Sequence, residues 1–135
     1  ECKDLKDKNI YNRIKHQDWI TLYDYVERGS LEWLYANCSV FLYPSFAEGF
    51  GYPPIEAMKY DKPIVASATS SIMEICGDAP LYICPYSKLE IEARLRTLLD
   101  MDLGELALKS NCRYKEINER QHQDLESIID IILSL

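Results

Sequence analysis

Short apolar runs alternate with helical apolar spacings along this chain of 135 residues. Residues 39–44, 64–67 and 81–84 form brief, nearly continuous apolar runs, which are typical of strands buried on both faces of a sheet. Residues 19–26 are rich in β-branched and aromatic side chains and are followed closely by Gly29, which predicts a fourth strand.

Helical spacings occupy the intervals between these strands. Ser30 stands at an N-cap position, and a short helix is predicted from there to about Asn37. A second helix is predicted from about Pro54 to Tyr60, because proline favours the first helical turn. A third is predicted over residues 72–76.

Two capping boxes mark helix starts nearer the C-terminus. They are Ser87-Lys-Leu-Glu90 and Asp102-Leu-Gly-Glu105. Residues 116–135 are predicted to form a long helix with an apolar stripe that we interpret as core, and residues 10–14 to contribute to a short one. The members of the stripe are Leu125, Ile128, Ile129, Ile132 and Leu133.

The alternation of strands and helices predicts an α/β fold. We expect a Rossmann-like, doubly wound parallel sheet of about four strands, with helices on both faces and further helices at the C-terminus. A doubly wound domain usually has five or six strands. Residues 1–135 are therefore interpreted as one partial domain whose first βαβ segment precedes Glu1.

Composition narrows the possible partners and compartment. The formal net charge of −7 argues against nucleic acid, since phosphate binding needs clustered Lys and Arg. The five cysteines have no zinc-like spacing, which indicates reduced thiols in a cytoplasmic protein and no metal site. No apolar run approaches the ~20 residues of a membrane span, while peripheral contact with a membrane stays open.

The candidate chemistry lies in Glu48-Gly-Phe-Gly-Tyr-Pro-Pro-Ile-Glu56. This segment follows a predicted parallel strand, where open α/β sheets bind their ligands. Gly49 and Gly51 permit close backbone approach, and the helix that follows presents free N–H groups and a positive dipole end to a diphosphate. The two carboxylates flank the turn, can accept hydrogen bonds from sugar or ribose hydroxyls, and can stabilise positive charge at an anomeric carbon.

A plainer interpretation of the same residues stays open on spacing alone. Glu56 in a first helical turn favours the helix dipole, and Glu48 ties down a loop. The glycines and prolines are then turn residues with no ligand to bind.

Three linked stretches add a family resemblance. Residues 44–58, 62–67 and 73–85 closely resemble, in this order, the C-terminal nucleotide-sugar-binding domain of family 4 retaining glycosyltransferases, which have the GT-B fold. The resemblance runs from about Trp19 to Leu99, more loosely to the end, and includes the two-glutamate motif of that family. It implies retaining transfer of a hexosyl group from a UDP- or GDP-sugar to a glycan or lipid acceptor.

The resemblance also assigns roles to residues. Glu48 matches the glutamate beside the donor sugar that is often assigned to catalysis, and Glu56 matches the one that binds the ribose hydroxyls. Tyr25 and Val26 match the strand end where the nucleobase rests, although the family usually has Gly where this chain has Asp24. Such enzymes need no metal for catalysis. The loop whose N–H groups meet the sugar and diphosphate matches Gly49, Phe50, Gly51 and Tyr52.

Further parts of the family pattern lie outside this chain. The Arg and Lys pair that neutralises the diphosphate would precede Glu1, as would the N-terminal acceptor domain. We therefore expect the isolated chain to be inactive without the missing domain or a complementary chain. In the relatives the final helix reaches back toward that domain, which implies some exposure of the stripe.

Two other functions stay open from the sequence. The chain could be a non-catalytic fragment or pseudoenzyme that binds a nucleotide or acts as an interaction module, or a phosphorylase-like relative. The leading interpretation is an enzyme of the cytoplasm, at the inner face of the membrane where its acceptor is a lipid.

Overall fold

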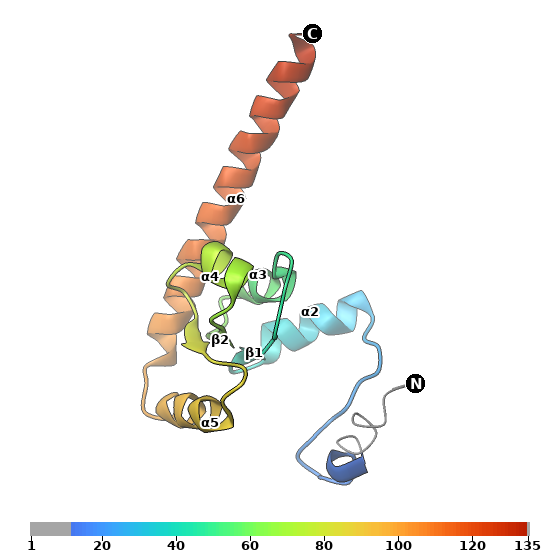
Figure 1. Ribbon diagram of the computed structural model, residues 1–135. Helices are drawn as coiled ribbons and strands as arrows, with labels where there is room; N and C mark the ends of the chain where they lie inside the picture. Colours follow the sequence, from blue (N-terminus) through green and yellow to red (C-terminus); the bar gives the residue numbers. More distant parts are fainter. Residues whose placement is uncertain (1–11, 135) are drawn as a thin grey trace. The chain divides into compact units, whose positions relative to one another are not determined.

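The computed structural model describes residues 12–134. The chain divides into two compact units, residues 1–33 and 34–135, and the boundary falls within the first labelled helix. Figure 1 labels the elements along the chain. Their order is α2 (Arg28–Asn37), β1 (Phe41–Tyr43), α3 (Tyr52–Lys59), β2 (Ile64–Ser67), α4 (Ser70–Cys76), β3 (Leu81–Ile83), α5 (Lys88–Thr97) and α6 (Leu103–Leu133).

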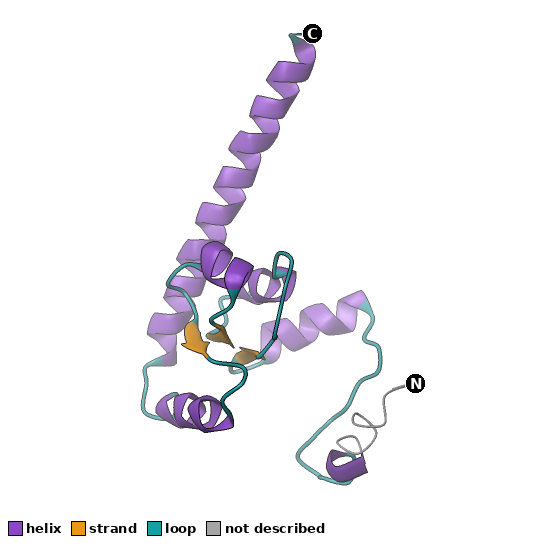
Figure 2. Ribbon diagram, viewed as in Figure 1, coloured by secondary structure: helices purple, strands orange, loops and turns teal. Residues whose placement is uncertain are grey.

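The sheet consists of three parallel strands in the order β1-β2-β3 (Figure 2). Phe41 lies opposite Ile64, and Val65 lies opposite Leu81. All four residues of β2 are fully buried, as expected for a central parallel strand. The three apolar runs that predicted buried strands therefore form the sheet, with β2 at the predicted residues.

Helices cover the sheet on both sides. Helix α3 contacts β1 and β2, α4 contacts β2, and α5 contacts β3. On one side, Val65 packs in a cluster with Ile83, Leu98 and Leu106. Neighbouring strand residues point to opposite faces, so the buried Ile64 needs cover on the other side, and Figure 1 shows α3 and α4 across the strands from α5. This arrangement confirms the α/β, Rossmann-like fold, with three strands among residues 12–134 where about four were predicted.

The prediction of a fourth strand over residues 19–26 is wrong. This segment is irregular, and Trp19 and Tyr25 are each 82% exposed. A preference for strand reflects the fit of a side chain to a pleated, half-buried surface. Without burial, aromatic and β-branched composition does not produce a strand. Residues 12–14 are helical, whereas residues 10 and 11 of the short predicted helix lie outside the described residues.

Two helix starts show how well side-chain caps can be predicted. Helix α5 begins after Ser87, whose hydroxyl accepts a hydrogen bond from the Glu90 N–H at 3.2 Å, which confirms the N-cap of the first capping box. The Ser87 N–H donates to the Cys84 carbonyl at 3.1 Å and not to the Glu90 side chain, so the reciprocal half of the box is not formed. Helix α2 begins at Arg28, two residues before the predicted cap. The Leu31 N–H donates to the Glu27 carbonyl at 2.9 Å, so Ser30 lies inside the helix.

Helix α6 is one continuous helix of 31 residues. Asp102 caps its start by accepting a hydrogen bond from the Gly104 N–H at 2.8 Å. The long helix predicted over residues 116–135 is therefore the C-terminal part of α6. No proline or glycine follows Gly104, so nothing interrupts the helix after its first turn.

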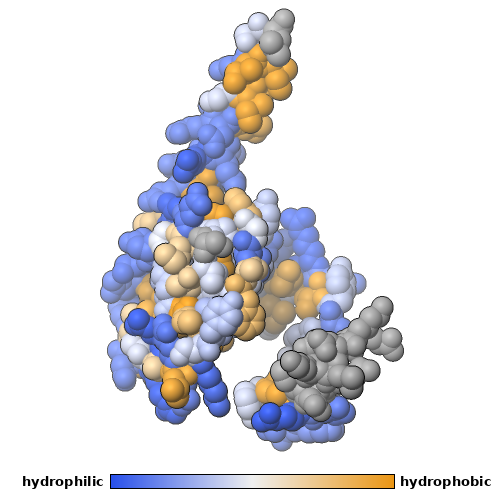
Figure 3. Space-filling view, in the orientation of Figure 1, coloured by the Kyte–Doolittle hydropathy of each residue, from blue (hydrophilic) through white to orange (hydrophobic). Residues whose placement is uncertain are grey.

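The two ends of α6 differ in burial. Leu106 and Ser110 are buried, where the helix contacts α3 and β2. The predicted core stripe near the C-terminus is between 45% and 79% exposed, and Figure 3 shows it as an apolar surface. The interpretation as core is wrong in this structure, because an apolar stripe is buried only where another element covers it. No helix among residues 12–134 is long and apolar enough to cross a membrane.

The described cysteines are free thiols. Cys38, Cys76, Cys84 and Cys112 form no disulfide, and Cys2 lies outside the described residues. Burial raises the pKa of the Cys76 thiol to about 11, so this side chain is uncharged at neutral pH.

Candidate functional site

The loop that carries Glu48, residues 44–51, leaves the sheet at the carboxyl end of β1. The Ser67 hydroxyl, at the end of β2, donates to the Tyr43 carbonyl at 3.4 Å, and the Ser71 hydroxyl in α4 donates to the Glu48 carbonyl at 2.9 Å. The loop after β1 is thus attached to the segment that follows β2. This edge of a parallel sheet is the usual place for ligands in open α/β folds.

Gly51 is the turn residue that needs glycine. It has a φ of 94°, is buried, and precedes the first residue of α3. A Cβ atom at this position would lie 3.4 Å from the Ile72 Cγ1 atom. A Cβ atom on Gly49 would meet no atom within 4 Å, and this glycine has no positive φ. Of the two glycines expected to allow a special backbone conformation, only Gly51 uses it.

The start of α3 offers fewer backbone N–H donors than were predicted from the sequence. Tyr52 is its first residue, and Pro53 and Pro54 follow. Proline has no backbone N–H, so Tyr52 supplies the one N–H of the first three helical residues. A bound diphosphate would depend mainly on the loop N–H groups of residues 49–52 and on the helix dipole.

Glu48 is held by two side-chain hydroxyls. The Tyr43 hydroxyl donates to its Oε1 atom at 2.5 Å, and the Ser45 hydroxyl donates to the same atom at 2.7 Å. The bond from Tyr43, and then the bond from Ser45, keep the pKa of the Glu48 carboxyl below its ordinary value. Burial and the neighbouring Glu48 raise the pKa of Tyr43 to about 12. At neutral pH, Glu48 is therefore an anion that accepts a bond from a neutral tyrosine.

Glu56 is held by one hydroxyl. It lies on α3, and its Oε2 atom accepts a hydrogen bond from the Tyr35 hydroxyl at 3.0 Å. Tyr35 is buried, and burial followed by the bond to Glu56 raises its pKa well above the ordinary value. The hydroxyl of Tyr35 consequently stays protonated and serves as a donor to Glu56.

One row of aromatic rings connects the two acid-binding tyrosines. The ring of Phe41 lies between them, with its centroid 5.4 Å from that of Tyr35 and 6.0 Å from that of Tyr43. Tyr60 extends the row by stacking on Tyr35 at 6.1 Å. These separations are typical of favourable aromatic pairs. The row gives both glutamates donors that are fixed in one packed unit.

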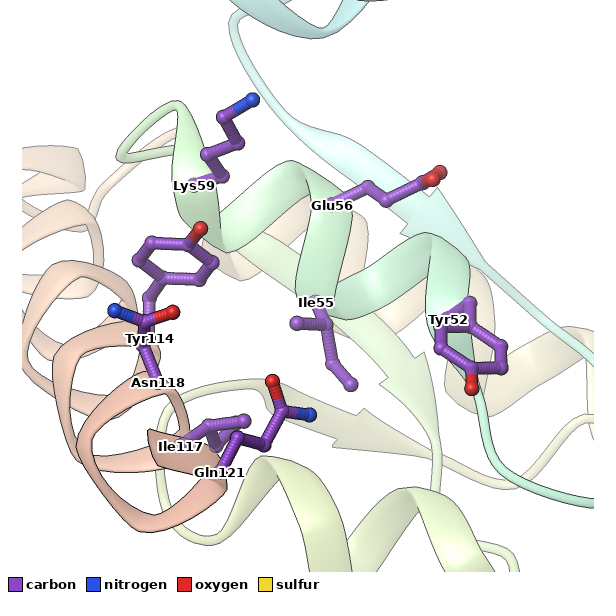
Figure 4. Close-up of a pocket in the computed structure, with 8 residues that line it drawn as sticks. All are labelled: Tyr52, Ile55, Glu56, Lys59, Tyr114, Ile117, Asn118 and Gln121. Atoms are coloured by element: carbon purple, nitrogen blue, oxygen red, sulfur yellow. The ribbon is translucent and has the colours of Figure 1, made fainter. Parts of the chain in front are cut away.

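The cavity in Figure 4 belongs to a different side of α3. Its volume is about 190 Å³, and it lies between α3 and α6. Glu56 lines it, but the carboxylate extends away from Tyr114, Asn118 and Gln121 of α6. Glu48 is not among the lining residues. The carboxylate of Glu56 is directed instead to Tyr35, on the side of the aromatic row.

A larger cavity of about 420 Å³ lies beside the loop. Phe50 lines it, as do Arg113 and Arg120 of α6. The Nε atom of Arg113 donates to the Ile75 carbonyl at 2.7 Å, so this guanidinium caps the end of α4. Neither this cavity nor the one in Figure 4 is lined by both glutamates.

The remaining predicted site residues are accessible to a ligand. The Phe50 and Tyr52 rings contact each other at 4.7 Å, and both side chains are exposed. Tyr25 is exposed and Val26 is partly buried, and both belong to the first unit of the chain. The predicted strand that was to place them is absent from the described residues, and their role at the nucleobase stays a prediction.

The hydroxyl donors to Glu48 and Glu56 were not predicted from the sequence. Tyr35 and Tyr43 stand at apolar positions, and their rings pack in the aromatic row. Their hydroxyls have the further role of binding Glu56 and Glu48. The sequence carried one signal: tyrosine rather than phenylalanine at buried positions needs a hydrogen-bond partner.

The fold defines the class of the protein. Three parallel strands with crossover helices form a Rossmann-like partial domain of the GT-B type. The model of the family described as glycosyl transferases group 1 matches residues 6–119, and the chain belongs to this family.

Named relatives agree with this assignment. The chain is 39% identical, over 99 residues, to the O-antigen chain mannosyltransferase B of Escherichia coli, a match that covers 73% of this chain and 26% of that protein. It is 30% identical, over 82 residues, to the O-antigen chain mannosyltransferase RfbU of Salmonella typhimurium, covering 61% and 23%. The chain thus spans about a quarter of the length of these relatives.

A solved structure supports the fold alone. The sucrose-phosphate synthase of Thermosynechococcus elongatus superimposes with a TM-score of 0.79 at 18% identity. The match covers 96% of this chain and 34% of that one.

Proposed function

We propose that this chain is the donor-binding part of a mannosyltransferase that uses a nucleotide-diphosphate sugar and retains the anomeric configuration. Glu48, in the loop after β1, and Glu56, on α3, carry the proposal, because each carboxylate is already oriented by a tyrosine hydroxyl. The names of the two relatives support mannose as the hexose. A glycan or a lipid is the acceptor.

The two acids would act at opposite ends of the donor. The Glu56 carboxylate would accept hydrogen bonds from the ribose hydroxyls, and charge-assisted bonds of this kind are strong. The N–H groups of residues 49–52 would meet the sugar and the diphosphate. Glu48 would lie beside the sugar, with Oε1 already bound to Tyr43 and Ser45 and with Oε2 toward the donor.

The transfer exchanges one bond at the anomeric carbon for another. The bond from this carbon to the donor phosphate oxygen breaks, and its electron pair leaves with the nucleoside diphosphate. The acceptor hydroxyl oxygen forms the new bond, and its proton passes to the departing diphosphate. The anionic Glu48 would stabilise the positive charge that develops on the sugar ring between these events.

The rest of the site follows from the same family pattern. The base is uracil or guanine, bound near Tyr25 and Val26, and no metal takes part. The first βαβ segment, with its Arg and Lys pair, and the acceptor domain would come from another part of the protein or from a complementary chain. The enzyme would work in the cytoplasm, at the inner face of the membrane.

A binding titration tests this function. UDP, GDP, UDP-mannose and GDP-mannose are titrated against wild type, Glu56→Ala and Glu92→Ala by calorimetry. Glu92 is a matched control, because it is an exposed helical glutamate whose ion pair with Arg96 lies on α5. We expect Glu56→Ala to weaken binding of one nucleotide by about 1.5–3 kcal/mol, the loss of a charge-assisted bond, while the control binds normally. Equal affinities for wild type and Glu56→Ala would exclude Glu56 from the site.

A further inference from the structure

We propose that Tyr35 and Tyr43 are positioning residues for the acid pair, with Tyr43 fixing Glu48 for the transfer step and Tyr35 fixing Glu56 for nucleotide binding. This inference rests on the proposed function. Packing of the aromatic row needs the two rings but not their hydroxyl groups. Holding the two carboxylates gives these hydroxyls a role.

The hydrogen-bond geometry gives each hydroxyl its task. Tyr43 and Ser45 both donate to Oε1 of Glu48, so the two bonds fix the carboxylate at the same oxygen. Tyr35 donates to Oε2 of Glu56, at the end of a side chain that is otherwise exposed. In both cases the tyrosine hydroxyl donates and a carboxylate oxygen accepts.

The rings make these donors rigid. Tyr35 is buried and contacts the rings of Phe41 and Tyr60 on either side. Tyr43 lies two residues after Phe41 in β1, so the two side chains stand on the same face of the strand and stack. A donor on a packed ring fixes the position of its acceptor better than a donor on a flexible side chain does. The packed ring has few conformations to lose.

Tyr82 shows what a merely structural tyrosine hydroxyl looks like. Its ring is partly buried, and its hydroxyl donates to the Gly77 carbonyl at 2.6 Å. This bond satisfies a buried polar group and touches neither glutamate. Tyr82→Phe is therefore the matched control for Tyr35→Phe and Tyr43→Phe, since each variant removes one hydroxyl and keeps its ring.

The kinetic constants separate the two tasks. In the full-length protein, release of nucleoside diphosphate from GDP-mannose and from UDP-mannose is measured for wild type and the three variants. We expect Tyr43→Phe to lower kcat about tenfold or more with KM within about twofold, because Glu48 acts at the reacting carbon. We expect Tyr35→Phe to raise KM about fivefold with kcat within about twofold, because one hydrogen bond to a binding group is lost. Tyr82→Phe should leave both constants within about twofold.

The outcomes distinguish this inference from the proposed function. An active wild type whose Tyr35→Phe and Tyr43→Phe variants behave like Tyr82→Phe would overturn the positioning roles and leave the function standing. Equal losses of kcat in all three variants would also overturn them, since that pattern reports general destabilisation. A wild type that neither binds nor turns over either sugar nucleotide would overturn the function, and the inference with it.

Discussion

Glu48 lies on a loop and Glu56 lies on a helix, and the protein holds these two carboxylates by different means. Glu48 has two hydroxyl donors on one oxygen and a backbone carbonyl bound by Ser71. Glu56 has one hydroxyl donor, from Tyr35, and a backbone held by the hydrogen bonds of α3.

The difference shows that a loop and a helix orient a carboxylate in different ways. A loop lacks repeating hydrogen bonds, so Glu48 needs side-chain donors from β1 and α4 to define its position. A helix fixes the backbone of Glu56 without help, and a single donor on a packed ring then orients its carboxylate. Changes around Glu48 should therefore affect the chemistry, and changes around Glu56 should affect binding.

The largest expected effect is a loss of sugar transfer in the Glu48→Gln variant. Glutamine keeps the size and one oxygen of glutamate but removes the negative charge that would face the sugar. We expect kcat in the full-length protein to fall about 10²–10³-fold, in line with the loss of one preorganised electrostatic group. Calorimetric affinity for the nucleotide diphosphate should change less than about threefold. A variant with the wild-type rate would remove Glu48 from the reaction.

The next effect is on the turn that joins the two acids. Gly51→Ala places a Cβ atom on a residue with a φ of 94° and close to Ile72. We expect it to lower the free energy of unfolding by about 1–2 kcal/mol, as the left-handed conformation disfavours alanine. Gly49→Ala is the control and should stay within about 0.5 kcal/mol of wild type. Equal denaturant midpoints for the two variants would show that this turn adopts another conformation.

A smaller effect is expected from the tether between Glu48 and α4. Ser71→Ala removes the hydroxyl that binds the Glu48 carbonyl. We expect a loss of about 0.5–1.5 kcal/mol in unfolding free energy and faster amide hydrogen exchange at residues 48–50. Exchange within α3, including Glu56, should be unchanged. Equal acceleration in both regions would contradict the separate anchoring of the two acids.

The smallest effect concerns pH. The pKa of Glu48 in the folded protein lies below its ordinary value of 4.5, because Tyr43 and Ser45 bind the anion. Its contribution to stability is therefore present above the unfolded pKa and is lost as the pH falls through the folded pKa. Ser45→Ala should raise the pKa of Glu48 and lower the Tm slightly at neutral pH. This difference in Tm should shrink under acidic conditions, and a constant difference would contradict the hydrogen bond to the anion.

The fold could be predicted where local chemistry and tertiary packing agree. Strand β2 combines a short apolar run with complete burial, so its residues were identified correctly. Helix α5 starts at a side-chain cap that is visible in the sequence. The predictions for residues 19–26 and for the apolar stripe of α6 were wrong for the same reason. Both patterns produce buried structure only when another element covers them. The sequence of the segment itself does not show which element covers it.

The sequence suggests residues for a candidate site, and their role stays a prediction, but it does not give their geometry. Glu48 and Glu56 stand out in the sequence because a glycine- and proline-rich turn separates them. Their donors do not stand out, since Tyr35 precedes Glu56 by 21 residues and meets it only in the folded chain. The lack of N–H groups at Pro53 and Pro54 could have been recognised from the residue types alone.

A crystal structure of the full-length protein with the nucleotide-mannose that it binds tests the central claim most directly. We expect the Glu56 carboxylate within hydrogen-bonding distance of the ribose hydroxyls, and the Oε2 atom of Glu48 beside the mannose ring. The bonds from Tyr35 and Tyr43 should persist in that complex. A nucleotide bound in the cavity of Figure 4, against Tyr114 and Asn118 and away from Glu48, would contradict the account.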